Sequence, residues 1–272
     1  MNPPFHLWLF STDPRTIREA VAAGVEGIVV DWERRGKRER QASVDTQIGL
    51  DTFDDLERVR ACTAARVVCR INGDGEASPD DVDRAIAGGA DEILLPMVRT
   101  AAEVEAVLYQ INGRCRLGIL VETMSACQHV NDLACLPLSR VYVGLNDLSI
   151  ERGTPSIFTA LADGTLEHVR RAFSVPFGFG GLTLPDRGQP IPCRLLIGEM
   201  MRIGSRFSFL RRSFHRDACG HDLGDAIPRI LHAVEQAAHR PTAETERDRL
   251  DLERAIQTLD QTMVLARALG RA

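Results

Sequence analysis

Residues 141–149 read VYVGLNDLS, a stretch that begins like a buried strand and ends in polar groups. A strand that is buried on both faces needs apolar side chains throughout, as in the parallel sheets of α/β proteins. The aspartate at position 147 therefore stands where such a strand would end. It either caps the helix that follows or holds a ligand.

Seven other apolar runs of similar length occur along the chain, and each run is followed by a stretch typical of a helix. All eight runs together span residues 6–11, 27–33, 66–72, 92–98, 116–123, 140–149, 175–181 and 206–214. Eight strand and helix units in 272 residues predict a (β/α)8 TIM barrel. An open doubly wound sheet is the alternative, but no glycine-rich dinucleotide fingerprint follows the first run.

The chain beyond the eighth unit predicts one additional long helix. We assign residues 1–240 to the barrel domain and residues 241–272 to this helix. The apolar residues that share one face of it are Leu252, Ile256, Leu259, Met263 and Ala266. Such a stripe needs a surface to cover, either on its own barrel or on a neighbouring subunit. We expect packing on another subunit, in a homo-oligomer that is a trimer or a hexamer.

Composition excludes several classes of partner. The formal net charge is −5 and the pI is about 5.8, so no global basic field attracts nucleic acid. The opening MNPPFHLWLF lacks the basic start and the long apolar run of a signal peptide or membrane span. Seven scattered cysteines without a CxxC pair predict neither a disulfide framework nor a zinc cage. We expect a cytoplasmic protein with no membrane and no nucleic-acid partner.

The basic residues limit the possible catalytic mechanisms. The chain has 33 lysines and arginines, and Lys37 is the single lysine among them. A Schiff-base enzyme needs a lysine whose pKa is lowered in an apolar pocket, and Lys37 lies instead in the charged run RRGKRER. Imine chemistry is therefore not expected. The five cationic side chains of residues 34–40 follow the second strand. They form either a solvated loop or a site for a phosphate, a second carboxylate or a coenzyme A tail.

Polar residues end several of the predicted strands, at the end of a barrel where active sites lie. They are Asp31, Glu33, Arg70, Asn72, Glu122 and Asp147. Because side chains alternate along a strand, the first two share one face of their strand, and so do the next two. Four carboxylates and one arginine therefore meet on one rim.

Glu122 and Asp147 come from neighbouring strands and form a candidate pair of metal ligands. Mg²⁺ and Mn²⁺ typically take one or two protein carboxylates and fill their other positions with water and substrate oxygens. The structural alternatives are a rim carboxylate for Glu122 and a helix N-cap for Asp147. Arg70 likewise either serves a ligand or forms a structural ion pair with Asp31 or Glu33.

Six segments of the sequence, in order and in matching strands, carry a resemblance to a known family. They are GVEGIVVDWE, VVCRIN, GGADEILLPMV, LGILVET, VYVGLNDLS and PFGFGG. They resemble the HpcH/HpaI aldolase and citrate lyase β-subunit family, most specifically at the GLNDLS and LVET strand ends. The likeness covers residues 6–215. It implies a (β/α)8 barrel and a metal-dependent enzyme that makes or breaks a carbon–carbon bond beside an enolate of pyruvate or an acyl thioester.

The resemblance also implies roles for single residues. Glu122 and Asp147 would hold a divalent metal, Mg²⁺ first and Mn²⁺ or Co²⁺ as alternatives, and Arg70 would face the enolate oxygen. The substrate carboxylate would be received by the backbone amides around Gly144, Leu145 and Asn146. The cation and Arg70 would share the enolate charge of a 2-oxo acid, so that the metal replaces the lysine this chain lacks.

The chain departs from the pyruvate aldolases of that family at the general base. Those enzymes carry a histidine just after the acidic pair of strand two, whereas here Arg34 follows Glu33. The base would be a water on the metal assisted by Asp31 or Glu33, or else His215 if it lies on the rim after strand eight. The citrate lyase-like branch has the acidic pair without the histidine, so this pair also favours that branch.

We therefore predict a class II, metal-dependent aldolase that acts on a 2-oxo acid and an aldehyde through a pyruvate-like enolate. Its candidate catalytic residues are Arg70, Asp31 and Glu33. The first alternative is a citrate lyase-like enzyme that acts on an acyl-CoA or acyl-carrier thioester. The second is a non-catalytic barrel that binds a small acid or serves as an assembly subunit.

Overall fold

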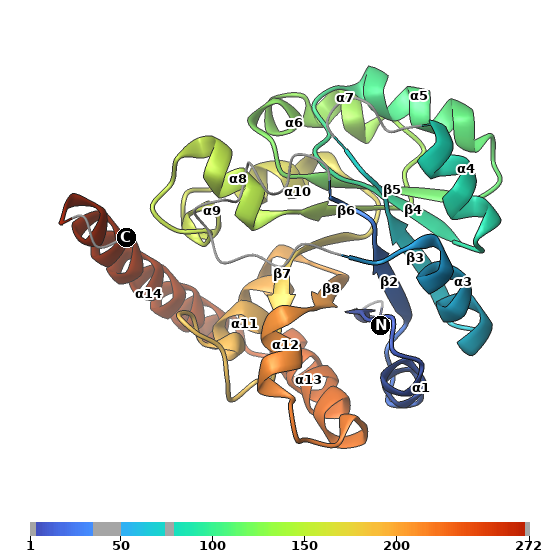
Figure 1. Cartoon of the computed structure of the whole chain (residues 1–272). Helices are drawn as coiled ribbons and strands as arrows, with labels where there is room; N and C mark the ends of the chain where they lie inside the picture. Colours follow the sequence, from blue (N-terminus) through green and yellow to red (C-terminus); the bar gives the residue numbers. More distant parts are fainter. Residues whose placement is uncertain (1–3, 35–49, 74–78, 270–272) are drawn as a thin grey trace.

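The computed structural model describes residues 4–34, 50–73 and 79–269, and its centre is a closed barrel of eight parallel strands (Figure 1). The strands pair in chain order, and β8 returns to β1. They are β1 (His6–Phe10), β2 (Gly27–Asp31), β3 (Arg66–Arg70), β4 (Glu92–Leu95), β5 (Arg116–Val121), β6 (Arg140–Val143), β7 (Phe177–Leu182) and β8 (Phe207–Leu210). The predicted (β/α)8 barrel is confirmed.

Helices follow the strands and cover the outside of the barrel (Figure 1). They are α1 (Pro14–Ala22), α3 (Phe53–Cys62), α4 (Pro79–Ala87), α5 (Ala101–Ile111), α6 (Met124–Gln128), α7 (Val130–Ala134), α8 (Leu145–Arg152), α9 (Thr159–Ala162), α10 (Thr165–Ala172), α11 (Cys193–Ile203), α12 (Arg212–Asp217), α13 (Leu223–Ala238) and α14 (Thr242–Ala268). Short polar side chains begin several of them. Asp13 accepts a hydrogen bond from the Thr16 amide at 2.7 Å, and Thr52 forms a reciprocal capping box with Asp55. Local sequence signals thus place the start of these helices.

The strands are shorter than the apolar runs that predicted them. β5 ends one residue before Glu122, and β6 ends four residues before Asp147. The eighth run also continues past its strand, because β8 ends at Leu210 and α12 begins at Arg212. Both faces of a barrel strand are covered, so the polar tails of these runs leave the sheet and form the loops and first helical turns at its rim.

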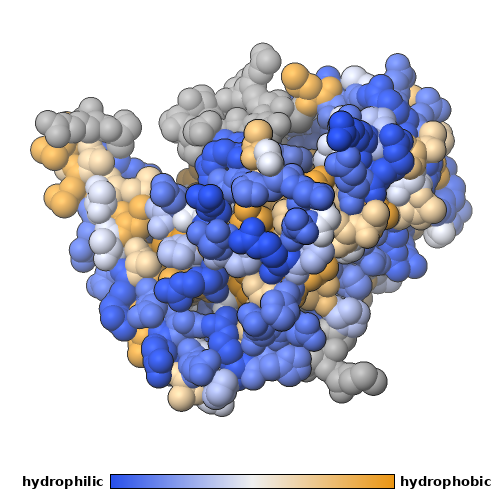
Figure 2. Space-filling view, turned by 90° about the horizontal axis from the view of Figure 1, so that it is seen from below, coloured by the Kyte–Doolittle hydropathy of each residue, from blue (hydrophilic) through white to orange (hydrophobic). Residues whose placement is uncertain are grey.

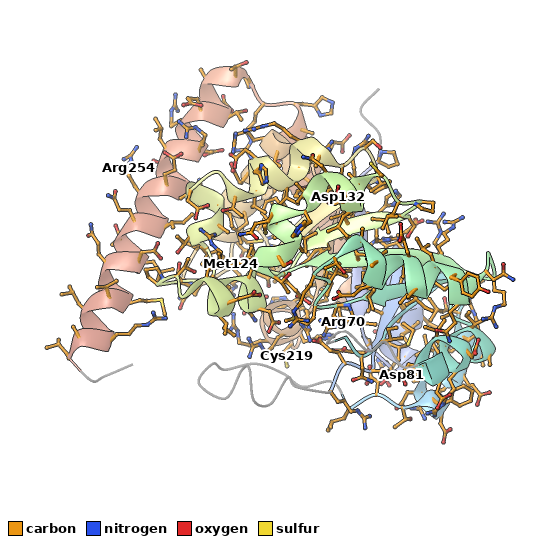
Figure 3. All side chains as sticks on the ribbon, turned by 90° about the horizontal axis from the view of Figure 1, so that it is seen from above. Arg70, Asp81, Met124, Asp132, Cys219 and Arg254 are labelled. Atoms are coloured by element: carbon orange, nitrogen blue, oxygen red, sulfur yellow. The ribbon has the colours of Figure 1, made fainter. Side chains whose placement is uncertain are left out.

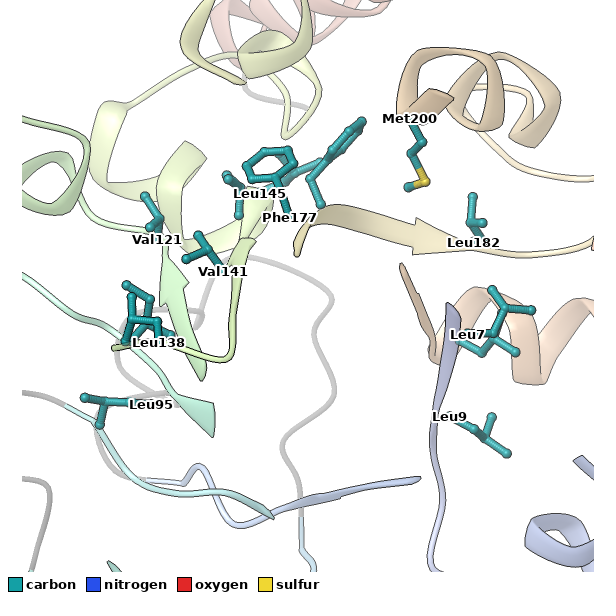
Figure 4. Packing of buried hydrophobic residues seen from close by; sticks show 14 of the residues in the cluster. Leu7, Leu9, Leu95, Val121, Leu138, Val141, Leu145, Phe177, Leu182 and Met200 are labelled. Atoms are coloured by element: carbon teal, nitrogen blue, oxygen red, sulfur yellow. The ribbon is translucent and has the colours of Figure 1, made fainter. Parts of the chain in front are cut away.

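Side chains of the strands alternate between two apolar layers. One layer fills the barrel and consists of Trp8, Val29, Val68, Leu94, Leu120, Tyr142, Phe207 and Phe209. The other lies between the strands and the helices, and Figure 4 shows part of it, including Leu7, Leu9, Leu95, Val121 and Val141. This arrangement is the one expected when helices cover a closed parallel sheet and side chains fill its centre.

A buried ion pair closes the amino-terminal end of the barrel. Arg140 donates to Glu92 through Nε at 2.6 Å and through Nη2 at 2.7 Å, and its guanidinium carbon lies 3.8 Å from the centre of the Trp8 ring. Gly118 provides the room, since a Cβ there would lie 2.8 Å from an atom of each charged partner. The opposite end, where the polar rim residues lie, is therefore the one that can admit a ligand.

The terminal helix α14 covers its own barrel along its first half. Leu252 and Ile256 are buried, and the helix packs against α11 and α9. Beyond them α14 projects from the barrel (Figure 1), where Val264 and Leu265 are 52% and 62% exposed. Figure 2 shows apolar side chains at this projecting end. The predicted helix is present, and its own barrel already buries Leu252 and Ile256 of the predicted stripe and partly covers Leu259.

Two expectations from composition can be compared with the described residues. None of the helices there is both long and apolar enough to cross a membrane. All seven cysteines carry unpaired thiols, so the structure contains no disulfide framework in the part of the chain that it describes.

Candidate active site

A cavity of about 450 Å³ opens at the carboxyl end of the barrel. Residues predicted from the sequence line much of it, namely Arg70, Glu122, Gly144, Leu145, Asn146 and Asp147. Asp31 and Glu33 are buried beside it and contact Arg70. Seen from above, Arg70 lies near the middle of the molecule (Figure 3). The structure thus brings the predicted rim residues together at one site.

Two carboxylates hold Arg70 in place. Its Nε and Nη2 donate to Asp31 Oδ1 and Oδ2 at 2.8 and 2.5 Å, and its Nη1 lies 2.9 Å from Glu33 Oε2. The register of the sheet pairs Asp31 with Arg70 across β2 and β3, which explains the bidentate contact. Burial works to lower the pKa of Arg70, but the charges of Asp31 and Glu33 outweigh it and raise that pKa. Arg70 therefore both forms the ion pair and faces the cavity.

Glu122 lies just beyond β5, and a backbone amide holds one of its two oxygens. Its Oε1 accepts a hydrogen bond from the Met97 amide at 2.9 Å. Met97 has a φ of 55°, a left-handed conformation that is uncommon for a residue with a large side chain. Burial first, and then repulsion from Asp147 and Glu33, raises the pKa of Glu122 to about 8. An ionised Glu122 therefore needs a positive partner in the cavity.

Asp147 lies in the first turn of α8 and is 7% exposed. The residue at the N-cap is Gly144, and no side chain hydrogen-bonds there. The N-cap role considered for Asp147 is therefore wrong. Asp147 lines the cavity from the first turn of α8, where the helix dipole favours a carboxylate.

The backbone amides near Gly144 differ in their availability. The Gly144 amide donates to the Val121 carbonyl at 3.1 Å, so it is already used inside the sheet. The amides of Leu145 and Asn146 belong to the first turn of α8, where no intrahelical acceptor exists. The expected carboxylate site therefore narrows to Leu145 and Asn146.

The sequence analysis missed Arg211, which follows β8 and lines the same cavity. Its Nη2 lies 3.1 Å from Asp31 Oδ2, so Asp31 contacts two arginines. The guanidinium carbons of Arg211 and Arg70 lie 4.7 and 5.5 Å from the centre of the Phe10 ring. Burial and the charge of Arg70 lower the pKa of Arg211. The strand-end rule that found Arg70 would also have found Arg211 if the eighth strand had been predicted to end at Leu210, where β8 does end.

The sequence profile of the HpcH/HpaI aldolase/citrate lyase family matches residues 5–163, which is more than half of the chain. The chain belongs to this family. The matched segment contains β1 to β6 and α8, and so includes all of the residues predicted for the site. No curated protein matches the chain.

Solved structures share this fold at low sequence identity. A HpcH/HpaI aldolase/citrate lyase family protein from Burkholderia cenocepacia is 17% identical with a TM-score of 0.58, covering 77% of this chain and 88% of that one. RipC from Yersinia pestis is 15% identical with a TM-score of 0.55, covering 88% and 97%. A HpcH/HpaI aldolase from Desulfitobacterium hafniense is 15% identical with a TM-score of 0.56, covering 88% and 95%. These similarities show the barrel fold.

The site fits a divalent cation, the cofactor implied for this family. Glu122 and Asp147 offer carboxylate oxygens, which Mg²⁺ and Mn²⁺ prefer. A cation between them would remove the repulsion that contributes to the raised pKa of Glu122. Within the described ranges, no three or more histidine, cysteine, aspartate or glutamate side chains group as metal ligands. The pair would therefore share the cation with oxygens from water or substrate.

No histidine of the described chain lines the cavity. His215 lies in α12 after β8, as expected, but its Nε2 contacts the Phe10 carbonyl at 2.7 Å. The geometry therefore does not favour His215 as the general base. Arg34, at the position of the family histidine, donates through Nη2 to the carbonyls of Leu50 and Asp51. Lys37 and the rest of the basic run lie outside the described residues.

Proposed function

We propose that this protein is a divalent-metal-dependent aldolase that makes or breaks a carbon–carbon bond next to a pyruvate-like enolate. The family consists of aldolases and lyases; the metal mechanism and the 2-oxo acid are our additions. One observation supports both additions. Two carboxylates that repel each other, Glu122 and Asp147, line the cavity, and the guanidinium of Arg70, which is held by Asp31, lines it too. Mg²⁺ is the first choice of cation, with Mn²⁺ or Co²⁺ as alternatives.

Each residue of the site has a task in this proposal. Arg70 donates a charge-assisted hydrogen bond to the keto oxygen of a 2-oxo acid. The amides of Leu145 and Asn146 bind the substrate carboxylate at the amino terminus of α8, where the helix dipole favours an anion. A divalent cation on Glu122 and Asp147 would supply Lewis-acid stabilisation of the charge that develops on the keto oxygen.

Asp31 and Glu33 act on the reaction through Arg70. Their carboxylates fix the guanidinium before substrate arrives, so that the donor needs no reorganisation when negative charge develops. Asp31 also contacts Arg211, which makes it the shared anchor of both arginines. We therefore assign these two carboxylates to positioning.

Exchange of the methyl protons of pyruvate with D2O tests the proposal without knowledge of the aldehyde. If the cation and Arg70 stabilise the enolate, wild-type protein with Mg²⁺ or Mn²⁺ should catalyse exchange, which is followed by NMR. Removal of the metal with a chelator should stop it. Arg70→Ala should lower the exchange rate by about 10²- to 10³-fold, the usual effect of removing one donor to a developing oxyanion.

Two control variants sharpen this test. Arg229→Ala removes an arginine of an exposed ion pair with Asp186 and should leave the exchange rate unchanged. Lys37→Ala should also leave it unchanged, because no imine is involved. Exchange that persists without metal and disappears in Lys37→Ala would contradict the metal mechanism.

A thioester lyase is the second candidate function. The observation that favours it is a group of basic side chains from Arg211, Arg212 and Arg216 at the cavity, which suit the phosphates of a coenzyme A tail. Turnover of acyl-CoA esters without pyruvate exchange would place this function first. Failure to bind any divalent metal would instead support the non-catalytic barrel.

We further propose a homo-oligomer, a trimer or a hexamer, that buries the projecting end of α14. The support is the exposure of the apolar side chains of Val264 and Leu265 at the projecting end of this helix. The seven unpaired thiols favour a reducing compartment such as the cytoplasm.

A further inference from the structure

One wall of the cavity is formed by a short connection between α8 and α9. Ile157 and Phe158, at the end of this connection, both line the cavity together with Asp147. Because α8 also carries Asp147, a movement of this wall would change the space beside the proposed metal ligand. Its position therefore bears on which substrates the cavity accepts.

The wall packs against the core through Ile157 and Phe158, and its own hydrogen bonds are local, such as the one from the Phe158 amide to Ser156 Oγ at 3.3 Å. The connection leaves α8 at Gly153, whose φ of 64° reverses the chain direction. The helix that follows, α9, has only four residues, and no side chain caps its N-terminus. A single helical turn of this kind is not stable alone, because nucleation fixes several residues for one hydrogen bond. Core packing of Ala160 and Leu161 holds α9 in part, and polar contacts with another element would fix its position further.

Helix α14 supplies that support from a distant part of the sequence. Thr159 Oγ1 donates to Asp260 Oδ2 at 2.9 Å, directly after Phe158. Nearer the C-terminus, Arg267 Nη2 donates to the Pro155 carbonyl at 3.3 Å and to the Thr154 carbonyl at 3.4 Å. Both ends of the wall segment are thus tied to one face of α14, which runs along one edge of the molecule (Figure 3).

Asp260 is a residue that does not favour the stability of the folded state at this position. Its second oxygen, Oδ1, is buried with no hydrogen-bond donor among the described residues. A buried carboxylate oxygen without a donor destabilises the folded state, and an apolar side chain would pack there without that penalty. The contact with Thr159 is therefore better explained by what it positions than by the stability it adds.

We infer that Asp260 is a positioning residue for the active site, and that it acts through Thr159 to fix the wall formed by Ile157 and Phe158. The terminal helix is then part of the machinery that shapes the substrate cavity, in addition to covering the barrel. What the cavity binds rests on the proposed function. The mechanical link between α14 and the wall does not.

Hydrogen exchange of the backbone amides at residues 153–162, measured by mass spectrometry, tests the link without any substrate. Asp260→Ala should reduce protection of this segment by about 10- to 100-fold, the effect of losing a hydrogen bond to a charged group. Asp260→Asn, which keeps an acceptor oxygen, should restore most of the protection. Arg254→Ala, in an exposed ion pair with Asp251 on the same helix, is the matched control and should change nothing.

Thr159 provides the reciprocal test. Thr159→Ser keeps the hydroxyl and should behave like wild type, whereas Thr159→Val should lose protection. The single hydroxyl proton of Thr159 is shared between Asp260 and the Ser156 carbonyl, which lies 3.0 Å from Oγ1. The valine variant therefore removes both contacts, whereas the Asp260 variant removes only the one with α14. Unchanged protection at residues 153–162 in Asp260→Ala, with a wild-type melting temperature, would overturn the inference.

A kinetic measurement distinguishes a positioning role of Asp260 from a purely structural contact with Thr159. In aldol addition of pyruvate to pentanal, Asp260→Ala should raise the KM for the aldehyde, because the apolar wall lines the substrate cavity, whereas the control Arg254→Ala should leave that KM unchanged. Reduced protection with an unchanged KM would overturn the link to the active site. If wild-type protein shows no pyruvate exchange at all, the proposed function fails, while the amide-exchange result still decides whether α14 holds the wall.

Discussion

Replacement of Gly144 by alanine tests the placement of Glu122 without changing any charge. Gly144 has a φ of −82°, so the backbone accepts alanine without strain. The added Cβ, however, would press against Glu122 Oε2 far inside contact distance and would lie 2.8 Å from Glu122 Cβ. The neighbouring backbone is held by the hydrogen bond from the Gly144 amide to Val121. The side chain of Glu122 must therefore rotate away from the new methyl group, and the 2.8 Å contact between the two Cβ atoms requires a small backbone shift as well.

The size of the effect follows from what that rotation breaks. Glu122 would lose its 2.9 Å hydrogen bond from the Met97 amide, and leaving that buried amide unpaired costs about 1–3 kcal/mol of unfolding free energy. Displacement of a functional group by about 1 Å typically lowers activity on the order of 10²-fold. We expect the Mn²⁺ affinity to fall by a similar factor, which corresponds to about 2.7 kcal/mol.

Titration calorimetry with Mn²⁺ and a thermal melt measure the two effects. Gly198→Ala is the matched control, because it adds the same methyl group on α11, where the nearest atoms are the side-chain ends of Arg240 at 3.3 Å and Asp248 at 3.7 Å. This control should keep its metal affinity. Wild-type Mn²⁺ affinity in Gly144→Ala would refute the reasoning, since Glu122 would then either not be a ligand or not be held against Gly144.

Three further predictions follow from the charges and the exposed surface. The pKa of Glu122 is raised from 4.5 to about 8, so between these values the folded metal-free protein binds one proton more than the unfolded chain, and its stability should fall as the pH rises through this range. For the same reason, Mn²⁺ binding at pH 7 should release a proton. This release is measured as calorimetric heats that depend on the buffer, and Glu122→Gln should remove that dependence. Arg140→Met alone should lower the unfolding free energy by about 3–5 kcal/mol, because the buried charge of Glu92 then has no ionic partner. Adding Glu92→Leu should recover most of this loss. Urea unfolding measures both effects, and equal losses in the single and double variants would contradict the ion pair. Val264→Glu combined with Leu265→Glu should reduce the mass found by light scattering, and an oligomer of unchanged mass would show that the end of α14 is not its interface.

The barrel could be predicted because its signals are local. Each strand is a short apolar run, and each helix has its own periodicity and often its own cap, as at Asp13 and Thr52. Eight such units in one chain leave few topologies that bury every apolar face. The strand ends were less certain, because an apolar run continues past the point where pairing stops, as Leu210 and α12 show.

The identity of the rim residues was also open to prediction, since side chains at the carboxyl ends of parallel strands converge once the strands close. Their individual roles were not. Asp147 appeared able to cap a helix until the structure placed Gly144 at the cap. The start of α8 depends on the Gly144 amide, which donates to the carbonyl of Val121 in the neighbouring strand and so keeps Gly144 outside the helix.

What the sequence by itself determined is the set of elements and the set of charged residues at one end of the barrel. Only the tertiary structure decided how those charges pair. Asp31 accepts hydrogen bonds from Arg70 on the adjacent strand and from Arg211, which lies 180 positions further along the chain. Asp260 accepts a hydrogen bond from Thr159, from which it is separated by 101 positions. Such contacts depend on barrel closure and on the reach of individual side chains. No local pattern of residues encodes either, because both are set by the packing of the whole chain.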